Sequence, residues 1–468
     1  MTTDATPPRP GRHVERPAVL PGVPPAATAR SRPPAMPATG PITLPGTAPS
    51  VPGDWAGDRL ASLAARLIAA PSENPDPDGW FELLAVDALE REATALGFRV
   101  SRQPVAPGRD NLHIVAAGDR PAAPVVFLGH SDVVPAGAGW TRDPFVPVVE
   151  GGRLYGRGAT DMKGGLAAAI AAMDVLSRDT GFAHPVELIV TVDEEDYATG
   201  VRRYLEEVPD REFVACIVAE PTDLDVVVGC RGAANLHLDI AGVAAHAGRP
   251  ADGASAIVAA SRIVALLQAE HEDWAQRAGE TSWAPTWNVG RIDGGHGTSI
   301  VPDRCAIDVD RRMMPHEQPD EILRDLLAAI DDAGITSDTI TVTGRLDMSM
   351  PGFLTDEDDP LPRLALDAVR ASGIPDARIR RWTAACEGGF LARQHGAPTI
   401  VLGPGDVTTE AHQPDESVAL RDLDAAAEAY VRLAAALADR VGHHADLGGA
   451  PDVPPPHAVD TPSLSSSP

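Results

Sequence analysis

Short apolar runs alternate with longer amphipathic stretches along most of the chain. The apolar runs have the length and composition of buried strands, and they cover residues 124–128, 186–192, 214–219 and 399–402. The amphipathic stretches carry apolar residues at helical spacing, and they cover residues 55–70, 80–97, 164–177 and 419–440. This alternation predicts an α/β domain with a mostly parallel sheet.

A middle segment follows a different pattern. Residues 233–243 alternate apolar and polar positions, as a strand with one buried face does. A helix, two strands, a helix and a strand are predicted after it, at 253–269, 286–292, 300–311, 318–332 and 338–344. The resulting β-α-β-β-α-β order is that of a ferredoxin-like α+β domain. We therefore expect residues 230–346 to form a second domain, inserted into a first domain of residues 54–229 and 347–441.

Both ends of the chain are rich in proline, alanine and small polar residues. Residues 1–53 and 442–468 offer little apolar surface to bury, so both segments are expected to be disordered. His443 and His444 fall in the second segment, where a solvated tail is expected rather than a metal site.

The chain is strongly acidic, with 67 acidic against 39 basic residues and a net charge of −28. Such a chain repels phosphate backbones and anionic lipids, so neither nucleic acid nor a membrane surface is an expected partner. The sequence predicts no secretory signal and no transmembrane helix. Cys216, Cys230, Cys305 and Cys386 show no CxxC spacing, and a chain of this length predicts no disulfide framework. The cytoplasm is the expected location.

Polar residues suited to metal chemistry follow the predicted strands. Ligands bind beyond the carboxyl ends of the strands in open α/β sheets, so these side chains are expected at one rim. Alone, each acid would be interpreted as a turn former or helix cap, and each histidine as a structural residue. Two histidines and three carboxylates on one rim suit a pair of zinc-like ions that share a bridging carboxylate. The five residues are His130, Asp161, Glu195, Glu220 and His412.

The motifs around these residues resemble the M20 metallopeptidase family, which includes acetylornithine deacetylase, succinyl-diaminopimelate desuccinylase, aminoacylase and glutamate carboxypeptidase. The resemblance covers about residues 55–440. It implies a two-metal hydrolase, with Zn²⁺ or Co²⁺, that cleaves the amide bond of an N-acyl amino acid or small peptide, nearest to the acetylornithine deacetylase branch. The matching segments are GHSDVVP (129–135), GRGATDMKGG (156–165), TVDEE (191–195), AEPTD (219–223), GVAAHAGRP (242–250) and GPGDVTTEAHQPDE (403–416).

The resemblance implies a role for each rim residue. His130 and Glu220 would hold one metal ion, Glu195 and His412 the other, and Asp161 would bridge the two.

Two more carboxylates take roles by the same resemblance. Asp132 would orient the His130 imidazole. Glu194 would be the general base that takes a proton from water and passes it to the leaving amine, which is compatible with its neighbour Glu195 pointing the other way.

The resemblance also implies residues for substrate and partner. His246 would reach the active site of a second copy in a homodimer and stabilise the developing oxyanion, with an ordinary loop histidine as the alternative. Arg312 would pair with the substrate carboxylate, while Arg311 is expected to be a solvated strand residue. Ser299 stands where many relatives have Asn, which puts one substrate hydrogen bond in doubt. Glu387 would contact a basic substrate side chain or, alternatively, cap a helix.

Three rival functions remain at this stage. A dipeptidase or carboxypeptidase would use the same site. A member of the fold that has lost catalysis would only bind a ligand, although the presence of Glu194 disfavours this. An acidic metal-storage protein would carry dispersed carboxylates, whereas here they follow strands.

Overall fold

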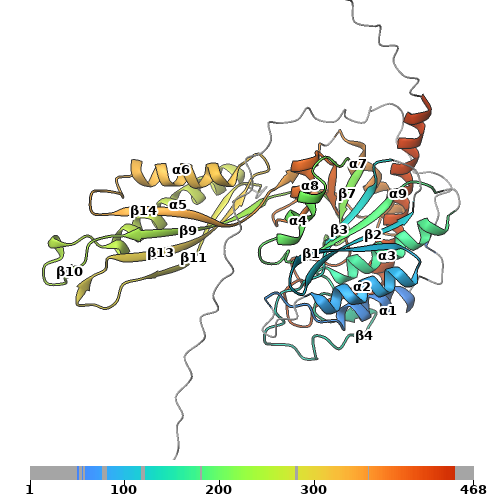
Figure 1. Ribbon diagram of the computed structural model, residues 1–468, viewed down its shortest axis with the longest axis horizontal. Helices are drawn as coiled ribbons and strands as arrows, with labels where there is room; N and C mark the ends of the chain where they lie inside the picture. The colour runs from blue at the N-terminus through green and yellow to red at the C-terminus, as the bar shows by residue number, and fades with distance from the viewer. Residues whose placement is uncertain are drawn as a thin grey trace, which may run out of the picture.

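The computed structural model describes residues 50–51, 55, 58–75, 82–117, 122–179, 182–279, 283–356 and 358–447. The described chain forms two lobes, each built around its own sheet (Figure 1). Most of segment 1–53 and the tail beyond position 447 lie outside the described residues, so their disorder stays a prediction.

The larger sheet contains the predicted strands at its centre. Its strand order is β1-β2-β6-β3-β7-β17-β8-β15, with β16 beside β8. The central parallel strands are β6 (Val186–Thr191), β3 (Val125–His130), β7 (Ala215–Val218) and β17 (Thr399–Val401). The flanking strands, which the sequence pattern did not predict, are β1 (Arg99–Ala106), β2 (Arg109–Ala117), β8 (Val226–Cys230), β15 (Phe353–Leu354) and β16 (Ile379–Trp382).

Helices cover both faces of this sheet. Alternate strand residues point to opposite sides, and in the central strands both sets of side chains are buried. Phe127 belongs to the core on one face, and its neighbours Val126 and Leu128 belong to the core on the other. The first core is shared with α1 (Asp58–Ile68), α2 (Leu83–Ala95), α3 (Lys163–Arg178), α7 (Pro360–Ala371) and α9 (Leu420–Leu447). The second core is shared with α4 (Thr199–Glu207) and α8 (Gly388–His395).

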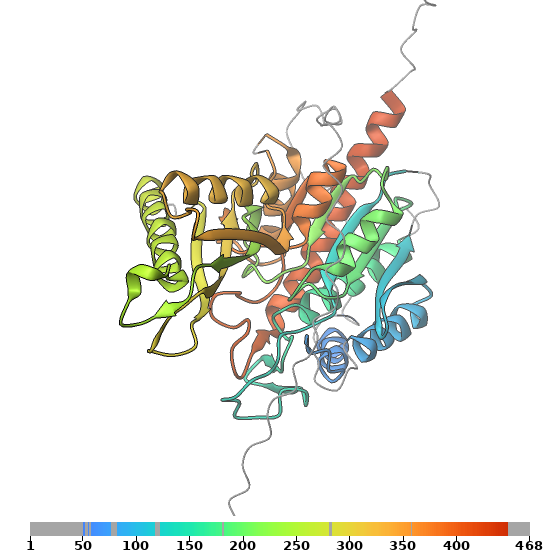
Figure 2. The ribbon, with the colours of Figure 1, turned by 60° about the vertical axis from the view of Figure 1, so that its left-hand side comes forward.

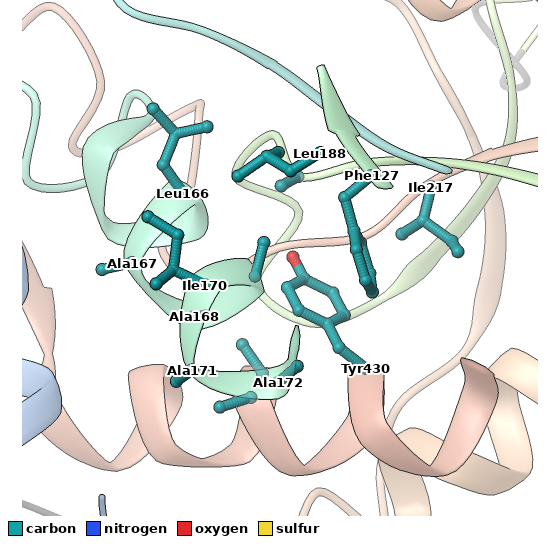
Figure 3. Close-up of a cluster of buried hydrophobic side chains, with 14 of the residues drawn as sticks. Phe127, Leu166, Ala167, Ala168, Ile170, Ala171, Ala172, Leu188, Ile217 and Tyr430 are labelled. Carbon is teal, nitrogen blue, oxygen red and sulfur yellow. The ribbon is translucent and has the colours of Figure 1, made fainter. Parts of the chain in front are cut away.

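Helices α3 and α9 pack closely against one face of the large sheet. Figure 3 shows Leu166 and Ile170 of α3 together with Phe127 and Tyr430. The Phe127 and Tyr430 ring centroids lie 5.0 Å apart, and the Tyr430 hydroxyl donates a 2.6 Å hydrogen bond to the carbonyl of Leu402. Helix α9 continues to Leu447, past position 442 where the disordered tail was expected to begin.

The second lobe has the element order that the sequence predicts. Its antiparallel sheet has the order β11-β13-β9-β14, with α5 and α6 packed on one face (Figures 1 and 2). Residues of β13 alternate between the two faces, and its polar residues Asp308, Asp310 and Arg312 point to the face opposite the helices. The elements are β9 (Gly232–Ala241), α5 (Ala256–Ala278), β11 (Thr286–Gly294), β13 (Arg304–Met313), α6 (Pro319–Asp332) and β14 (Thr341–Met350).

The predicted strand 300–311 is divided in two. Proline has no backbone N–H to donate to a ladder, and Pro302 separates β12 (Ile300–Val301) from β13. The short β12 pairs instead with β10 (Ala245–His246), and the 3₁₀ turn η1 (Pro250–Asp252) follows. A three-stranded sheet of β18 (Ser417–Ala419), β5 (Arg153–Tyr155) and β4 (Val148–Glu150) completes the first lobe. Among the described helices, none has the length and apolar character needed to cross a bilayer.

Candidate metal centre

The carboxyl ends of the central strands place the predicted ligands at one rim. His130 is the last residue of β3, while Glu195 follows β6 and Glu220 follows β7. Asp161 lies in the turn before α3 and is 7% exposed. Parallel strands have their carboxyl ends at the same edge of a sheet, so residues far apart in the sequence meet there.

His130 centres a first group of ligand atoms. Its Nε2 lies 3.3 Å from Glu220 Oε1 and 3.4 Å from Asp161 Oδ1. On the other side of the ring, Nδ1 lies 3.0 Å from the Asp132 carbonyl oxygen and 3.4 Å from its Oδ1. An imidazole that donates from Nδ1 keeps Nε2 free to bind a metal, and these contacts suit Asp132 to the ring-orienting role that the resemblance implies.

His412 centres a second group that shares Asp161 with the first. The His412 Nε2 lies 3.3 Å from Asp161 Oδ2 and 3.3 Å from Glu195 Oε1. The two oxygens of Asp161 therefore face different histidines. His412 is a non-glycine residue at φ 63°, a conformation that is seldom adopted without a compensating contact.

The electrostatics of the rim fit a pair of divalent cations. Within the described residues, the buried His130 Nε2 and Glu195 Oε1 have no hydrogen-bond partner, which is uncommon for buried polar atoms. Burial raises the pKa of Glu220 to about 7, and the neighbouring Asp161 charge adds to the rise. Burial likewise raises the pKa of Glu194. Positive charge between the carboxylates would relieve this crowding, so the donor set suits two cations that share Asp161.

Glu194 lies beside the first group. Its Oε2 is 4.0 Å from His130 Nε2, close enough to act on a water held there. The ligand atoms of His130, Glu194 and Glu220 lie within 4.8 Å of one another, as do those of His130, Asp161 and Glu195. Geometry alone therefore permits Glu194 either as base or as ligand.

A buried network that the sequence analysis missed holds the acidic segment in place. The Asp132 carboxylate accepts the backbone N–H groups of Glu194 and Glu195, at 3.2 and 3.1 Å. The Asn74 side-chain amide donates to Asp132 Oδ2 and Asp193 Oδ1, both at 3.0 Å. Asp193 has a φ of 67°. It directly precedes Glu194 and Glu195, so the run of three acidic residues could have marked it as part of the site. Nothing in the local sequence marks Asn74, because its partners lie far along the chain.

Glu387 is buried and occupies the N-cap position of α8, but its side chain makes no capping hydrogen bond. One carboxylate oxygen accepts a 2.5 Å hydrogen bond from the Thr191 hydroxyl, while the other, Oε1, has no partner among the described residues. Burial raises the pKa of Glu387 to about 8.

The structure decides between the two adjacent arginines of β13. Arg311, expected to be solvated, is 2% exposed and lies over the rings of Trp274 and Trp287, 4.2 and 4.7 Å from their centroids, so that prediction was wrong. It points to the helix-covered side because β13 alternates. Arg312 lies on the open face, donates to Asp310 at 3.0 Å, and pairs in register with Ala233, near the point where the second lobe joins the first.

His246 and Ser299 lie together in the second lobe. His246 in β10 pairs in register with Ile300, and the Ala247 N–H donates to the Ser299 carbonyl at 3.0 Å. Both residues are exposed. Strand β10 lies at the end of the second lobe that is remote from the first lobe (Figure 1), so the structure does not bring His246 to the metal rim of its own chain.

Comparisons with known proteins agree with this geometry. The family model of peptidase family M20/M25/M40 matches residues 126–436. A succinyl-diaminopimelate desuccinylase of Acidovorax ebreus is 30% identical over 395 residues, which are 79% of this chain and 96% of that protein.

Two solved structures share the fold. An M20 metallo-carboxypeptidase from Sulfolobus solfataricus, Sso-CP2, superposes with a TM-score of 0.69 at 17% identity, covering 82% of this chain and all of that one. The Bacillus subtilis YXEP protein, described as a dinuclear metal-binding M20 peptidase, has a TM-score of 0.59 at 16% identity, covering 81% and 97% of the two chains. The chain belongs to peptidase family M20/M25/M40 and is a metal-dependent amide hydrolase.

Proposed function

We propose that this enzyme hydrolyses the amide bond of N-acyl amino acids that carry a free α-carboxylate, with acetyl or succinyl as the acyl group. One observation carries the proposal: two histidines share the carboxylate of Asp161, and Glu194 lies within 4.0 Å of the first histidine. The named activity of the desuccinylase relative supports an acyl amino acid as substrate.

The ligand set follows from the two groups. His130 and Glu220 would hold one ion, Glu195 and His412 would hold the other, and Asp161 would be shared by the two. Zn²⁺ is the expected metal and Co²⁺ the alternative, since imidazole and carboxylate ligands suit both. When bound, the two ions supply Lewis acidity that lowers the pKa of water and polarises the amide carbonyl.

The chain's own residues move the protons. Glu194 accepts a proton from the attacking water and returns it to the leaving amine, so that a carboxylate and a free amine are released. Asp132 fixes the direction of this base, because it holds the backbone of Glu194 and the ring of His130.

Substrate binding depends on local positive charge, because the chain as a whole carries a net charge of −28. Arg312 offers a planar fork on the open face of the second lobe for the substrate carboxylate. Ser299 is assigned to the substrate side only together with His246, since the Ala247 N–H after His246 donates to the Ser299 carbonyl. Glu387 is held by Thr191 through its other oxygen. Its Oε1 has no hydrogen-bond partner within the described part of the chain and suits a donor from a basic substrate.

We further propose a homodimer in which His246 serves the site of a second copy. Exposed apolar side chains gather around α5, β11 and the β10–β12 pair, where a second copy would cover them. These residues are Val243, Ile257, Val258, Ile292 and Ile300.

The cysteines are free and buried, which supports a reducing compartment such as the cytoplasm.

A substrate screen tests the proposal. Apoenzyme reconstituted with Zn²⁺ or Co²⁺ is offered N-acetyl, N-succinyl and N-formyl amino acids and dipeptides, and released amine is measured. The highest kcat/KM is expected for an acetyl or succinyl amino acid. A clear preference for dipeptides would assign the enzyme to the peptidases of the family, and full activity in metal-free protein would overturn the mechanism.

A further inference from the structure

Glu416 is a buried carboxylate that contacts the loop of Asp161 but belongs to neither group of candidate metal ligands. Its side chain is inaccessible to solvent, and its two oxygens accept three backbone N–H groups from the loop that carries Asp161. These hydrogen bonds come from Gly158 at 3.1 Å, Thr160 at 2.8 Å and Asp161 itself at 3.0 Å. The carboxylate thus fixes the backbone of the bridging ligand.

Arg157 is the charged partner of Glu416 and is also buried. Its Nη1 donates to Glu416 Oε2 at 2.6 Å, and its Nη2 donates to the carbonyl of Ala136 at 3.2 Å. The Nη1 group also lies 3.5 Å from the carbonyl of Gln413, next to His412. Arg157 therefore contacts the loop that follows Asp132 and the loop that contains His412.

The pair links the loops that carry two of the proposed ligands, Asp161 and His412. His412 precedes Glu416 by four positions in one loop, and Asp161 donates its own N–H to Glu416. By contrast, His130 belongs to β3, whose hydrogen bonds to β6 and β7 already hold it. The distance between Asp161 and His412 therefore depends on the Arg157–Glu416 pair, whereas that between His130 and Glu220 depends on the sheet.

We propose that Arg157 and Glu416 are positioning residues that chiefly set the affinity of the metal position formed by Asp161, Glu195 and His412, with a smaller effect on the position of His130 and Glu220, which shares only Asp161 with it. This inference rests on the proposed ligand set. A buried ion pair contributes little net stability but imposes a defined geometry, which agrees with a positioning role. Changes to groups that orient metal ligands typically lower metal affinity about 10–100-fold.

The test is a Zn²⁺ titration of apoenzyme, followed by calorimetry and elemental analysis. Wild type is expected to bind two ions. Glu416→Gln keeps the shape but loses the charge, so the ion held by Asp161, Glu195 and His412 should bind about 10–100-fold more weakly. The other ion should be weakened less, because Asp161 is the one ligand that it shares with this position. Excess Zn²⁺ should then restore kcat with an unchanged KM, which a general loss of folding would not allow.

Matched variants keep the test decisive. Glu317→Gln removes the partner of another buried arginine, Arg311, at the same 2.6 Å distance but in the second lobe, and should leave both metal affinities unchanged. If Glu416→Gln does not fold, Arg157→Lys serves instead, because it keeps the charge and loses the fork that reaches Ala136.

Each result has one meaning. Two ions bound with wild-type affinity in the Glu416 and Arg157 variants would overturn the positioning role, and so would an equal weakening of both ions. His412→Ala separates the two proposals: it should lose the second ion. If it retains both ions, the proposed ligand set itself is wrong and the positioning role falls with it.

Discussion

Adjacent glutamates occupy different positions around the metal rim because of the backbone that carries them. Glu195 Oε1 lies 3.3 Å from His412, whereas Glu194 Oε2 lies 4.0 Å from His130. Both backbone N–H groups are held by Asp132, so the two side chains diverge from one anchored segment. This divergence is compatible with the proposed roles, in which one acid would bind metal while its neighbour would move protons.

The base assignment predicts the behaviour of Glu194→Gln. The amide keeps the shape of the side chain but accepts no proton, so kcat should fall about 10²–10⁴-fold. Zinc content, measured by elemental analysis, should stay at the wild-type level. A variant that loses one ion would instead make Glu194 a ligand, an arrangement that its proximity to His130 and Glu220 permits.

The substrate clamp predicts a dependence on the free carboxylate. A charge-assisted pair with Arg312 is worth roughly 1.5–3 kcal/mol, so Arg312→Ala should lower kcat/KM for free-acid substrates about 10–100-fold. The same variant should change kcat/KM for the corresponding esters far less, and Arg312→Lys should restore only part of the loss. Equal wild-type rates on acids and esters would refute the clamp.

At the scale of elements, ion pairs between strands and loops stabilise the lobe away from the metal rim. Glu187 of β6 is 5% exposed and faces His113 of β2 at 2.9 Å and Arg211 at 2.5 Å. Burial alone would raise the pKa of Glu187, but His113 and Arg211 outweigh it and lower the pKa below its usual value of 4.5.

This lowered pKa predicts a pH-dependent effect of Glu187→Gln. An acid with a lowered folded-state pKa stabilises the protein above its unfolded-state pKa, and the stabilisation disappears as the pH falls through the folded-state value. The variant should lose roughly 1–3 kcal/mol of unfolding free energy at pH 7, measured with urea, and progressively less below pH 4.5.

An exposed acid provides the control for that measurement. Glu206 pairs with Arg203 on the surface of α4 and is 68% exposed, so Glu206→Gln should change stability by less than about 1 kcal/mol at any pH. A Glu187 difference that stays constant from pH 7 to pH 4 would show that packing, and not charge, stabilises this contact.

At the scale of the whole molecule, the position of His246 predicts complementation between inactive chains. If His246 serves the site of a second copy, mixing His246→Ala with Glu194→Gln chains should restore activity, since a hybrid dimer has one intact site. Random exchange should give about a quarter of the wild-type activity per chain. Recovery is measured after proven subunit exchange, and its absence would favour the loop-histidine alternative.

Dimer formation supplies the control for this experiment. Val258 is 59% exposed in the apolar group of the second lobe, and Val149 is 55% exposed on β4 of the first lobe. Val258→Asp in both parent chains should abolish exchange and recovery, whereas Val149→Asp should leave both intact.

The sequence by itself determined the central strands and the position of the candidate ligands after them. Buried parallel strands appear as uninterrupted apolar runs, and polar residues directly after such runs must lie at one edge. Strand β1 was missed because only part of it is buried, so its apolar pattern is weak. The β-α-β-β-α-β order of the second lobe was likewise legible, because its strands alternate between a covered and an open face.

Only the tertiary structure decided what each side chain contacts. Whether Arg311 or Arg312 faces the helices depends on the register of β13 with β9, which no local pattern fixes. Glu387 hydrogen-bonds Thr191, and Glu416 holds the loop of Asp161, across separations of 196 and 255 positions. Such contacts arise when distant segments pack against one sheet. Local periodicity reports which face of an element is buried, and the folded chain alone determines which partner lies there.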